Sequence, residues 1–150
     1  MLLYRISVCK RASDLSGAGA KLFGGRWNSI GVPMVYMASS RALAALEVLA
    51  HLTAIQDPEN FCITVFDVPE SSVTEIELHL LPDNWNTHPA PSSLKKKSDA
   101  FVKSNTALLL KVPSAIIEDE YNYIVNVAHP LLSEIKILSS KPFIFDKRLQ

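Results

Sequence analysis

Cysteine is scarce in this chain, with two copies in 150 residues, and no uninterrupted hydrophobic run reaches the roughly 18 residues that a membrane span needs. Cys9 and Cys62 have neither metal-ligand spacing nor the density of a disulfide framework, so we interpret them as buried free thiols. The N-terminal residues lack a basic segment followed by a long apolar run, so no signal peptide is evident. We therefore expect a cytoplasmic protein without membrane association.

The chain also lacks an excess of charge of either sign. Fifteen Lys and Arg residues balance fifteen Asp and Glu residues, whereas nucleic-acid-binding domains usually carry a basic excess. The one basic run, residues 95–97, is more typical of a solvated helix face than of a phosphate-binding patch. The four histidines show no metal-ligand spacing. We expect no direct DNA binding, no metal and no resident cofactor.

Hydrophobic residues make up 48% of the chain, and its length suits a single domain with its own core, covering residues 1–150. The patterns predict strands at residues 2–8, 34–37, 61–68, 107–112 and 121–127, with shorter ones at 74–78, 134–138 and 143–145. They predict helices from Ser39 or Ser40 to about residue 53 and over 94–105, and loops at 16–20 and 82–93. The count favours an α+β fold, with a central multi-stranded β-structure flanked by a few helices.

The segment Gly24-Gly25-Arg26-Trp27-Asn28-Ser29 is the first candidate for a ligand site. Glycines allow close approach to a backbone, and an arginine fork suits phosphate or carboxylate. The alternative is a surface Arg26 that stacks on Trp27. Tyr36, on the following strand, is either a core residue or an aromatic platform for a planar ring.

Glu47 is the only polar residue between Ala42 and Ala50, in a helix that we expect to be buried because it is apolar nearly all round. A carboxylate in such a helix is costly unless it has a partner or a task. The partner would be Arg26 or Arg41, and the task would be to hold a sugar hydroxyl and stabilise positive charge. His51, one turn later, is better explained by packing or by its place at the helix C-terminus than as a general base.

Three further polar residues lie at strand ends. Ser114 follows an apolar strand and would usually be a turn hydroxyl; no Gly-x-Ser-x-Gly elbow surrounds it, which argues against a hydrolase nucleophile. The even spacing of Asn122 and Asn126 places both on one side of a strand, as core amides or as ligand contacts.

Together these segments resemble a known family. The resemblance is carried by residues 4–6, 17–20, 24–29, 31, 33, 35–36, 42–47, 112–114, 122–126, 129–130 and 145–149, in this order and over nearly the whole chain. The chain resembles RES-domain proteins, the toxin half of RES–Xre toxin–antitoxin pairs. It departs from the family at Ser98 and Phe101, where members often have glycine and tryptophan.

The resemblance implies that Arg26, Glu47 and Ser114 are the Arg, Glu and Ser for which the family is named. It implies a fold like that of ADP-ribosyltransferase toxins, and cleavage of the nicotinamide–ribose bond of NAD as substrate. Arg26, Tyr36 and Asn122 would contact NAD. An Xre-like helix-turn-helix antitoxin would be the partner. The alternatives are transfer of ADP-ribose to a protein and a non-catalytic nucleotide-binding module.

Overall fold

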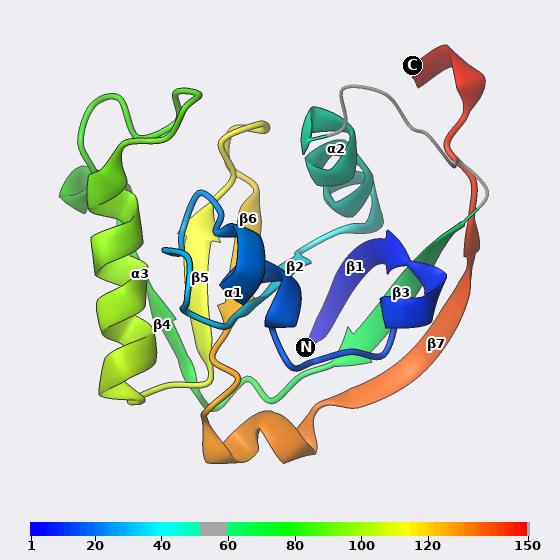
Figure 1. Ribbon diagram of the computed structural model, residues 1–150, viewed down its shortest axis with the longest axis horizontal. Coiled ribbons are helices and arrows are strands. Elements are labelled where there is room, and N and C mark those ends of the chain that lie inside the picture. Colours follow the sequence, from blue (N-terminus) through cyan, green and yellow to red (C-terminus); the bar gives the residue numbers. More distant parts are fainter. Residues whose placement is uncertain (52–59, 150) are drawn as a thin grey trace.

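The computed structural model describes residues 1–51 and 60–149. Within them the chain forms one α+β domain with a seven-stranded mixed sheet and three α-helices (Figure 1), which confirms the predicted fold class. The strands are β1 (Leu2–Val8), β2 (Val35–Ala38), β3 (Phe61–Asp67), β4 (Val73–Glu75), β5 (Leu109–Pro113), β6 (Tyr121–Val125) and β7 (Lys136–Phe143). The helices are α1 (Ala18–Phe23), α2 (Arg41–His51) and α3 (Ser92–Ser104).

The sheet has the strand order β4-β5-β6-β2-β1-β3-β7, and only the β4–β5 pair is parallel among the described strands. Its weakest joint lies between β1 and β2, which pair at the single position Tyr4↔Ala38. By contrast, β1 pairs with β3 along its whole length. The sheet therefore divides into β4-β5-β6-β2 and β1-β3-β7, and Figure 1 shows α3 beside the first part and α2 near the joint.

Three buried clusters form the core, and two of them include residues of a helix. Leu94 and Phe101 of α3 pack against Leu110 and Ile124 of β5 and β6. Leu43 and Ala44 of α2 form a second cluster with Ile6, Ala38 and Phe145. The third cluster combines residues of β1, β2 and β3 with residues of β5 and β6, namely Leu3, Val35, Met37, Phe66, Val68, Leu108, Leu109 and Val125. Burying one such large side chain contributes about 1.5–3 kcal/mol, so α2 and α3 are fixed firmly to the sheet.

Two expectations about secondary structure were wrong. The predicted loop at residues 16–20 contains the start of α1, because Gly17 adopts a left-handed φ of 70° from which the helix begins at Ala18. The predicted strands at 134–138 and 143–145 are replaced by the single strand β7, which runs through Pro142. Proline is tolerated there because β7 is an edge strand.

Helix α2 is less buried than we expected. Only Leu43 and Ala44 are fully buried, although the helix packs on β1 and β2. Its predicted N-cap is confirmed, since the Ser40 hydroxyl accepts a 3.1 Å hydrogen bond from the Leu43 amide. The predicted end near residue 53 lies outside the described residues.

The interpretation of the cysteines as free thiols was wrong, because Cys9 and Cys62 form a disulfide. The register of the β1–β3 pair explains it. Val8 lies opposite Phe61, and the Cys9 amide continues the pairing with a 2.9 Å hydrogen bond to the Asn60 carbonyl. This brings two residues 53 positions apart to a Cα–Cα distance of 4.8 Å.

In residues 1–51 and 60–149, no helix is long and apolar enough to cross a membrane.

Candidate active site

Glu47 meets two of the other predicted site residues. Its Oε1 accepts hydrogen bonds from the amide of Asn122 and, at 3.3 Å, from the hydroxyl of Ser114. Asn122 lies in the middle of the sheet, opposite Ala38 of β2 and Val112 of β5, so its backbone is held from both sides. The site is thus built from one helix and from the ends of two strands that come 67 and 75 residues later.

The ion pair considered for Glu47 is absent from the described residues, where no Lys, Arg or His nitrogen lies within 4.0 Å of its carboxylate. Arg41 instead lies over the ring of Tyr4, with 4.6 Å between the guanidinium carbon and the ring centroid. Neutral donors therefore hold the Glu47 carboxylate. Its negative charge remains available to a ligand.

Arg26 is half-buried beside the loop at residues 82–91. Its Nη1 donates to the carbonyl oxygens of Trp85 at 2.9 Å and Thr87 at 3.0 Å. Burial lowers the pKa of Arg26, while the nearby charge of Glu47 raises it. The guanidinium remains a cation because its ordinary pKa lies far above neutrality. Among the described residues Nε and Nη2 have no hydrogen-bond partner, so they are open to a ligand.

Asn28 is the centre of the loop that carries Arg26. Its side chain is fully buried, and Nδ2 donates to the carbonyl oxygens of Ala20, Ser29 and Val32 at 2.8–3.1 Å. Its Oδ1 accepts from the hydroxyl of Tyr36. Sequence reasoning assigned Asn28 no role of its own. The only signal was its place inside the glycine-arginine motif.

Tyr36 holds the same loop through its hydroxyl group. Its ring packs against the α3 cluster, and its hydroxyl accepts a 3.3 Å hydrogen bond from the Trp27 amide. Burial raises the pKa of Tyr36 well above its usual value. A Cβ atom on Gly25 would lie 2.8 Å from this hydroxyl, so the glycine makes room for Tyr36 itself. Contact between Tyr36 and NAD stays a prediction.

Trp27 and Asp99 fix the remaining sides of the loop. Trp27 is 3% exposed within the α3 cluster, and Arg26 does not stack on it in the described residues, which removes that alternative. Asp99 of α3 accepts two hydrogen bonds from Ser29, from the amide at 3.1 Å and from the hydroxyl at 2.6 Å. Sequence reasoning did not assign this role to Asp99. At the departures from the family pattern, Ser98 and Phe101 are buried and serve packing.

Ser114 is a turn hydroxyl, as predicted, and it also contacts Glu47. Besides donating to Glu47, its hydroxyl accepts from the amides of Ile116 and Ile117 at 3.1 and 3.2 Å, as a turn hydroxyl does. These hydrogen bonds together fix the loop that follows β5.

Asn122 and Asn126, which the sequence analysis placed on one side of a strand, differ in their contacts. Whereas Asn122 faces Glu47, Asn126 is fully buried, donates to Asn105 Oδ1 at 2.8 Å and accepts from the Ala128 amide. Asn126 is therefore a core amide. His51 is exposed at the C-terminus of α2, and its Nδ1 lies 2.7 Å from the backbone carbonyl oxygen of Glu47.

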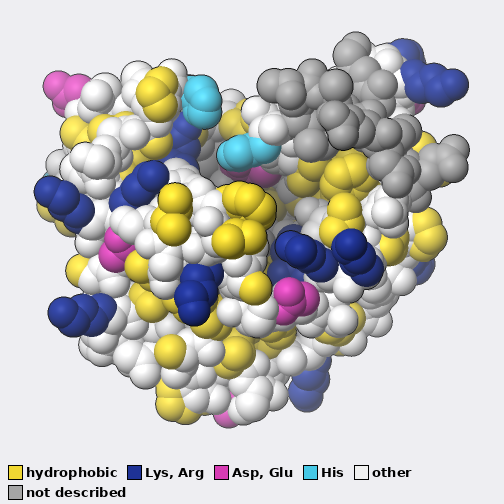
Figure 2. Space-filling view, viewed as in Figure 1, with side chains coloured by type: hydrophobic (Ala, Val, Ile, Leu, Met, Phe, Trp, Pro, Cys, Tyr) yellow, Lys and Arg dark blue, Asp and Glu magenta, His cyan; other side chains and the backbone are white. Residues whose placement is uncertain are grey.

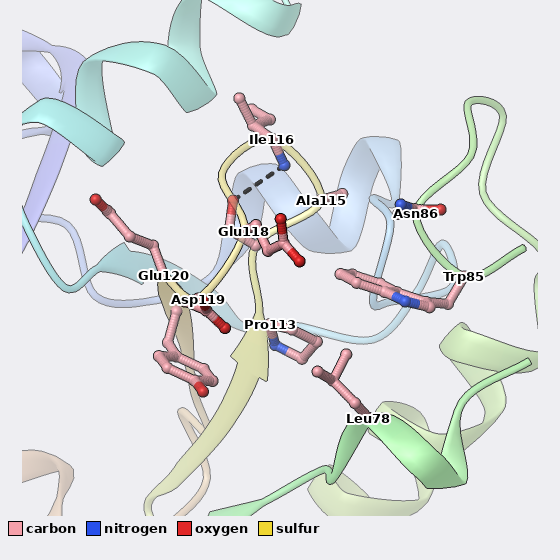
Figure 3. A pocket seen from close by; sticks show the side chains of 11 residues that line it. Leu78, Trp85, Asn86, Pro113, Ala115, Ile116, Glu118, Asp119 and Glu120 are labelled. Atoms are coloured by element: carbon pink, nitrogen blue, oxygen red, sulfur yellow. Dashed lines mark hydrogen bonds between the residues drawn. The ribbon is translucent and has the colours of Figure 1, made fainter. Parts of the chain in front are cut away.

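A cavity of about 420 Å³ opens next to Ser114 (Figure 3). One wall comes from Leu78, Trp85 and Asn86, and the other from residues 113–121. In Figure 2 this side of the molecule is hollowed near its upper edge, with histidine and acidic side chains beside the hollow. Within residues 1–51 and 60–149, no three His, Cys, Asp or Glu side chains are grouped so that they could hold a metal ion.

Similarity to known proteins identifies the family of this chain. The model of the RES domain matches residues 2–146. The chain belongs to the RES domain family. A relative from Sphingobium sp. (strain YBL2), named Prs ADP-ribosylating toxin, is 40% identical to this RES-domain chain over 92% of the chain and 88% of the relative.

A second relative, Toxin Res of Photorhabdus laumondii, is 39% identical over 99% of this chain and 97% of its own length. The fold is similar to a chain in the crystal structure of the M. tuberculosis MbcT–MbcA toxin–antitoxin complex. That match has a TM-score of 0.76 and 22% sequence identity, and it covers 95% of this chain and 84% of the other. This RES domain thus has toxins as its relatives and shares its fold with a component of a toxin–antitoxin complex.

Proposed function

We propose that this RES-domain protein is a toxin that consumes NAD by cleaving the bond between nicotinamide and ribose. The observation that supports this proposal most is the way in which the Glu47 carboxylate is held. Its carboxylate is held by Asn122 and Ser114 and faces no protein cation within 4.0 Å among the described residues. A carboxylate without a direct ion pair suits a reaction in which positive charge develops on the substrate.

In the proposed reaction, the C1′–N1 bond breaks and its electron pair goes to the pyridinium nitrogen. The ring leaves as neutral nicotinamide, so no general acid is needed. The ribose becomes an oxocarbenium-like cation, as in glycoside cleavage. Water then adds at C1′ and loses a proton to solvent, which yields ADP-ribose. The protein must orient the ribose and stabilise its cation.

Each proposed role follows from the contacts. Glu47 holds the ribose hydroxyls and offsets the developing charge, while Asn122 and Ser114 keep its carboxylate in place. Arg26, steadied through Nη1 by the Trp85 and Thr87 carbonyls, offers its remaining N–H groups to the phosphates. Tyr36 holds the loop under Arg26 and would contact the ribose or base at its exposed edge.

Transfer of ADP-ribose to a protein is the second candidate, because the relative from Sphingobium is named an ADP-ribosylating toxin. It needs the same bond cleavage, with a nucleophile of the acceptor protein in place of water. The two candidates therefore share every residue named above. They differ only in what approaches C1′ after nicotinamide leaves.

Purified protein with NAD labelled in the adenylate half separates the candidates. Free labelled ADP-ribose means hydrolysis, and label on protein from an added cell extract means transfer. Glu47→Gln should lower either rate by about 100- to 1000-fold while the fold persists. Glu134→Gln, an exposed carboxylate on the 3₁₀ turn Pro130–Glu134, is the matched control and should keep full activity. NAD consumption at an unchanged rate by Glu47→Gln would exclude the proposed mechanism.

We also propose an Xre-like helix-turn-helix antitoxin as the partner. The structural neighbour comes from a toxin–antitoxin complex, and this chain exposes three large apolar side chains around the Arg26 loop. Leu22, Phe23 and Ile30 are 64–74% exposed. Phe23→Ser with Ile30→Ser should weaken co-purification with an Xre-like protein encoded beside this chain. Leu149→Ser, also exposed, is the control and should leave the complex unchanged.

A further inference from the structure

Trp85 presents an aromatic surface to the cavity beside Ser114. The chain has two tryptophans, and the other, Trp27, is buried in the core. Trp85 packs partly against the α3 cluster and also lines the cavity. Figure 3 shows its indole beside the loop that follows β5, with the carboxylate of Glu118 directed toward the same space.

The backbone of Trp85 connects this cavity to the candidate active site. Its carbonyl oxygen accepts the 2.9 Å hydrogen bond from Arg26, and Ser114, which donates to Glu47, lines the same cavity. A ligand whose ribose lies at Glu47 would thus have the cavity on one side and Arg26 close by. The volume of about 420 Å³ falls in the range of ligand pockets.

We propose that Trp85 is the stacking surface for the nicotinamide ring of NAD, which enters the cavity between Trp85 and the loop at residues 114–120. This assignment rests on the proposed function and names the part of the substrate that the cavity receives. Tyr36 is less suited to that task, because its hydroxyl is bound within the Arg26 loop and its ring packs against the α3 cluster.

The charge of the cavity selects nicotinamide over adenine. The ring of NAD is a pyridinium cation before cleavage, and cations are attracted to the face of a tryptophan ring. Exposed Glu118 and Asp119 line the cavity and add to this attraction, while they repel the phosphates. The phosphates are then directed toward Arg26. When the bond breaks the ring becomes neutral, so its attraction to the cavity falls and release of nicotinamide is favoured.

Tryptophan fluorescence tests the proposal directly. In the Glu47→Gln background, which prevents turnover, nicotinamide mononucleotide and NAD should quench the emission, because each carries the cationic ring. ADP-ribose and AMP, which lack it, should not quench. NADH, with a neutral ring, should bind several-fold more weakly than NAD. In the Trp85→Phe variant the remaining emission comes from buried Trp27 and should not respond to nicotinamide mononucleotide.

Kinetics of the otherwise unmodified protein give a second measure. Trp85→Ala should raise KM for NAD about tenfold without lowering kcat, because the attraction to the ring is strongest in the bound substrate, before the bond breaks. Trp85→Phe, which keeps an aromatic ring, should recover most of the affinity and remains informative if the alanine variant fails to fold.

Several outcomes would overturn the assignment. Quenching by AMP but not by nicotinamide mononucleotide would place adenine in the cavity. A fall in kcat without a change in KM in Trp85→Ala would mean that Trp85 only positions Arg26 and does not contact the ring. NAD consumption without any quenching would remove the ring site and leave the proposed function intact. If the wild-type protein consumes no NAD, the proposed function fails, while quenching by nicotinamide mononucleotide would still support the ring site.

Discussion

The hydroxyl of Tyr36 donates a 2.8 Å hydrogen bond to Oδ1 of Asn28. This contact ties strand β2 to the loop that carries Arg26. Because the Asn28 amide also binds three backbone carbonyls, one buried side chain fixes α1, the loop and β2 relative to each other. The position of the Arg26 guanidinium therefore depends on Asn28, a fully buried side chain that would not itself touch the substrate.

Replacing Asn28 by alanine should reduce both stability and activity. Four hydrogen bonds are lost, and buried groups remain unpaired, which costs about 1–3 kcal/mol for each such group. Tyr36→Phe removes one of these bonds together with the 3.3 Å bond from the Trp27 amide, and should lower the free energy of unfolding by about 1–3 kcal/mol. Urea unfolding together with NAD turnover measures both effects. Equal stability of Asn28→Ala and wild type would contradict the central place of Asn28.

Gly25→Ala should disturb the same loop by crowding. The added Cβ atom would lie 2.8 Å from the Tyr36 hydroxyl and 2.9 Å from Asn28 Oδ1. We expect a loss of about 1–3 kcal/mol in the free energy of unfolding and a fall in activity. Gly19→Ala is the matched control, since its nearest neighbour lies at 3.9 Å and alanine favours the helix there. Thermal melts of the two variants should move in opposite directions.

The two asparagines near β6 should respond differently to alanine. Asn122→Ala removes a hydrogen bond to the Glu47 carboxylate, so kcat/KM for NAD should fall about tenfold or more, with only a small change in stability. Asn126→Ala removes a buried amide that bonds Asn105 and Ala128, so stability should fall while the folded protein keeps its activity. Turnover normalised to the folded fraction distinguishes these results. A catalytic defect confined to Asn126→Ala would reverse our assignment.

Reducing the disulfide should destabilise the protein without removing its activity. Cys9 and Cys62 close a loop of 53 residues, for which the chain-entropy model gives a contribution of about 4 kcal/mol, and measured values are typically 2–4 kcal/mol. The variant with both cysteines replaced by serine should match the reduced wild type in urea and should not respond to reductant. A reductant effect that persists in this variant would have another cause.

Much of the fold follows from local patterns in the sequence. The strand at residues 2–8 and the serine cap of α2 were predicted as observed, because alternation and capping act over a few residues. The disulfide was not predictable in this way, since it depends on the register of two strands that are distant in sequence. The start of α1 was missed because small residues without a periodic pattern resemble a loop.

In the candidate site, too, some residues could be predicted from the sequence and others could not. Arg26 and Glu47 stood out because their residue types are unusual for their surroundings, whereas Ser114 was assigned through the resemblance to the family. Asn28 and Asp99 did not, because their importance comes from carbonyl and hydroxyl partners that only the folded loop brings into reach. The residues that would meet the ligand were therefore found more easily than those that hold them.

The separation between Glu47 and its partners also has a consequence during synthesis. Ser114 and Asn122 follow Glu47 by 67 and 75 residues, and the two carbonyl groups that bind Arg26 follow Arg26 by 59 and 61 residues. A ribosome adding about 5–20 residues per second completes Asn122 some 4–15 seconds after Glu47. During that interval the nascent chain carries only half of the site. A harmful activity would then begin only with the finished molecule, and prematurely terminated products would be harmless to the cell that makes them.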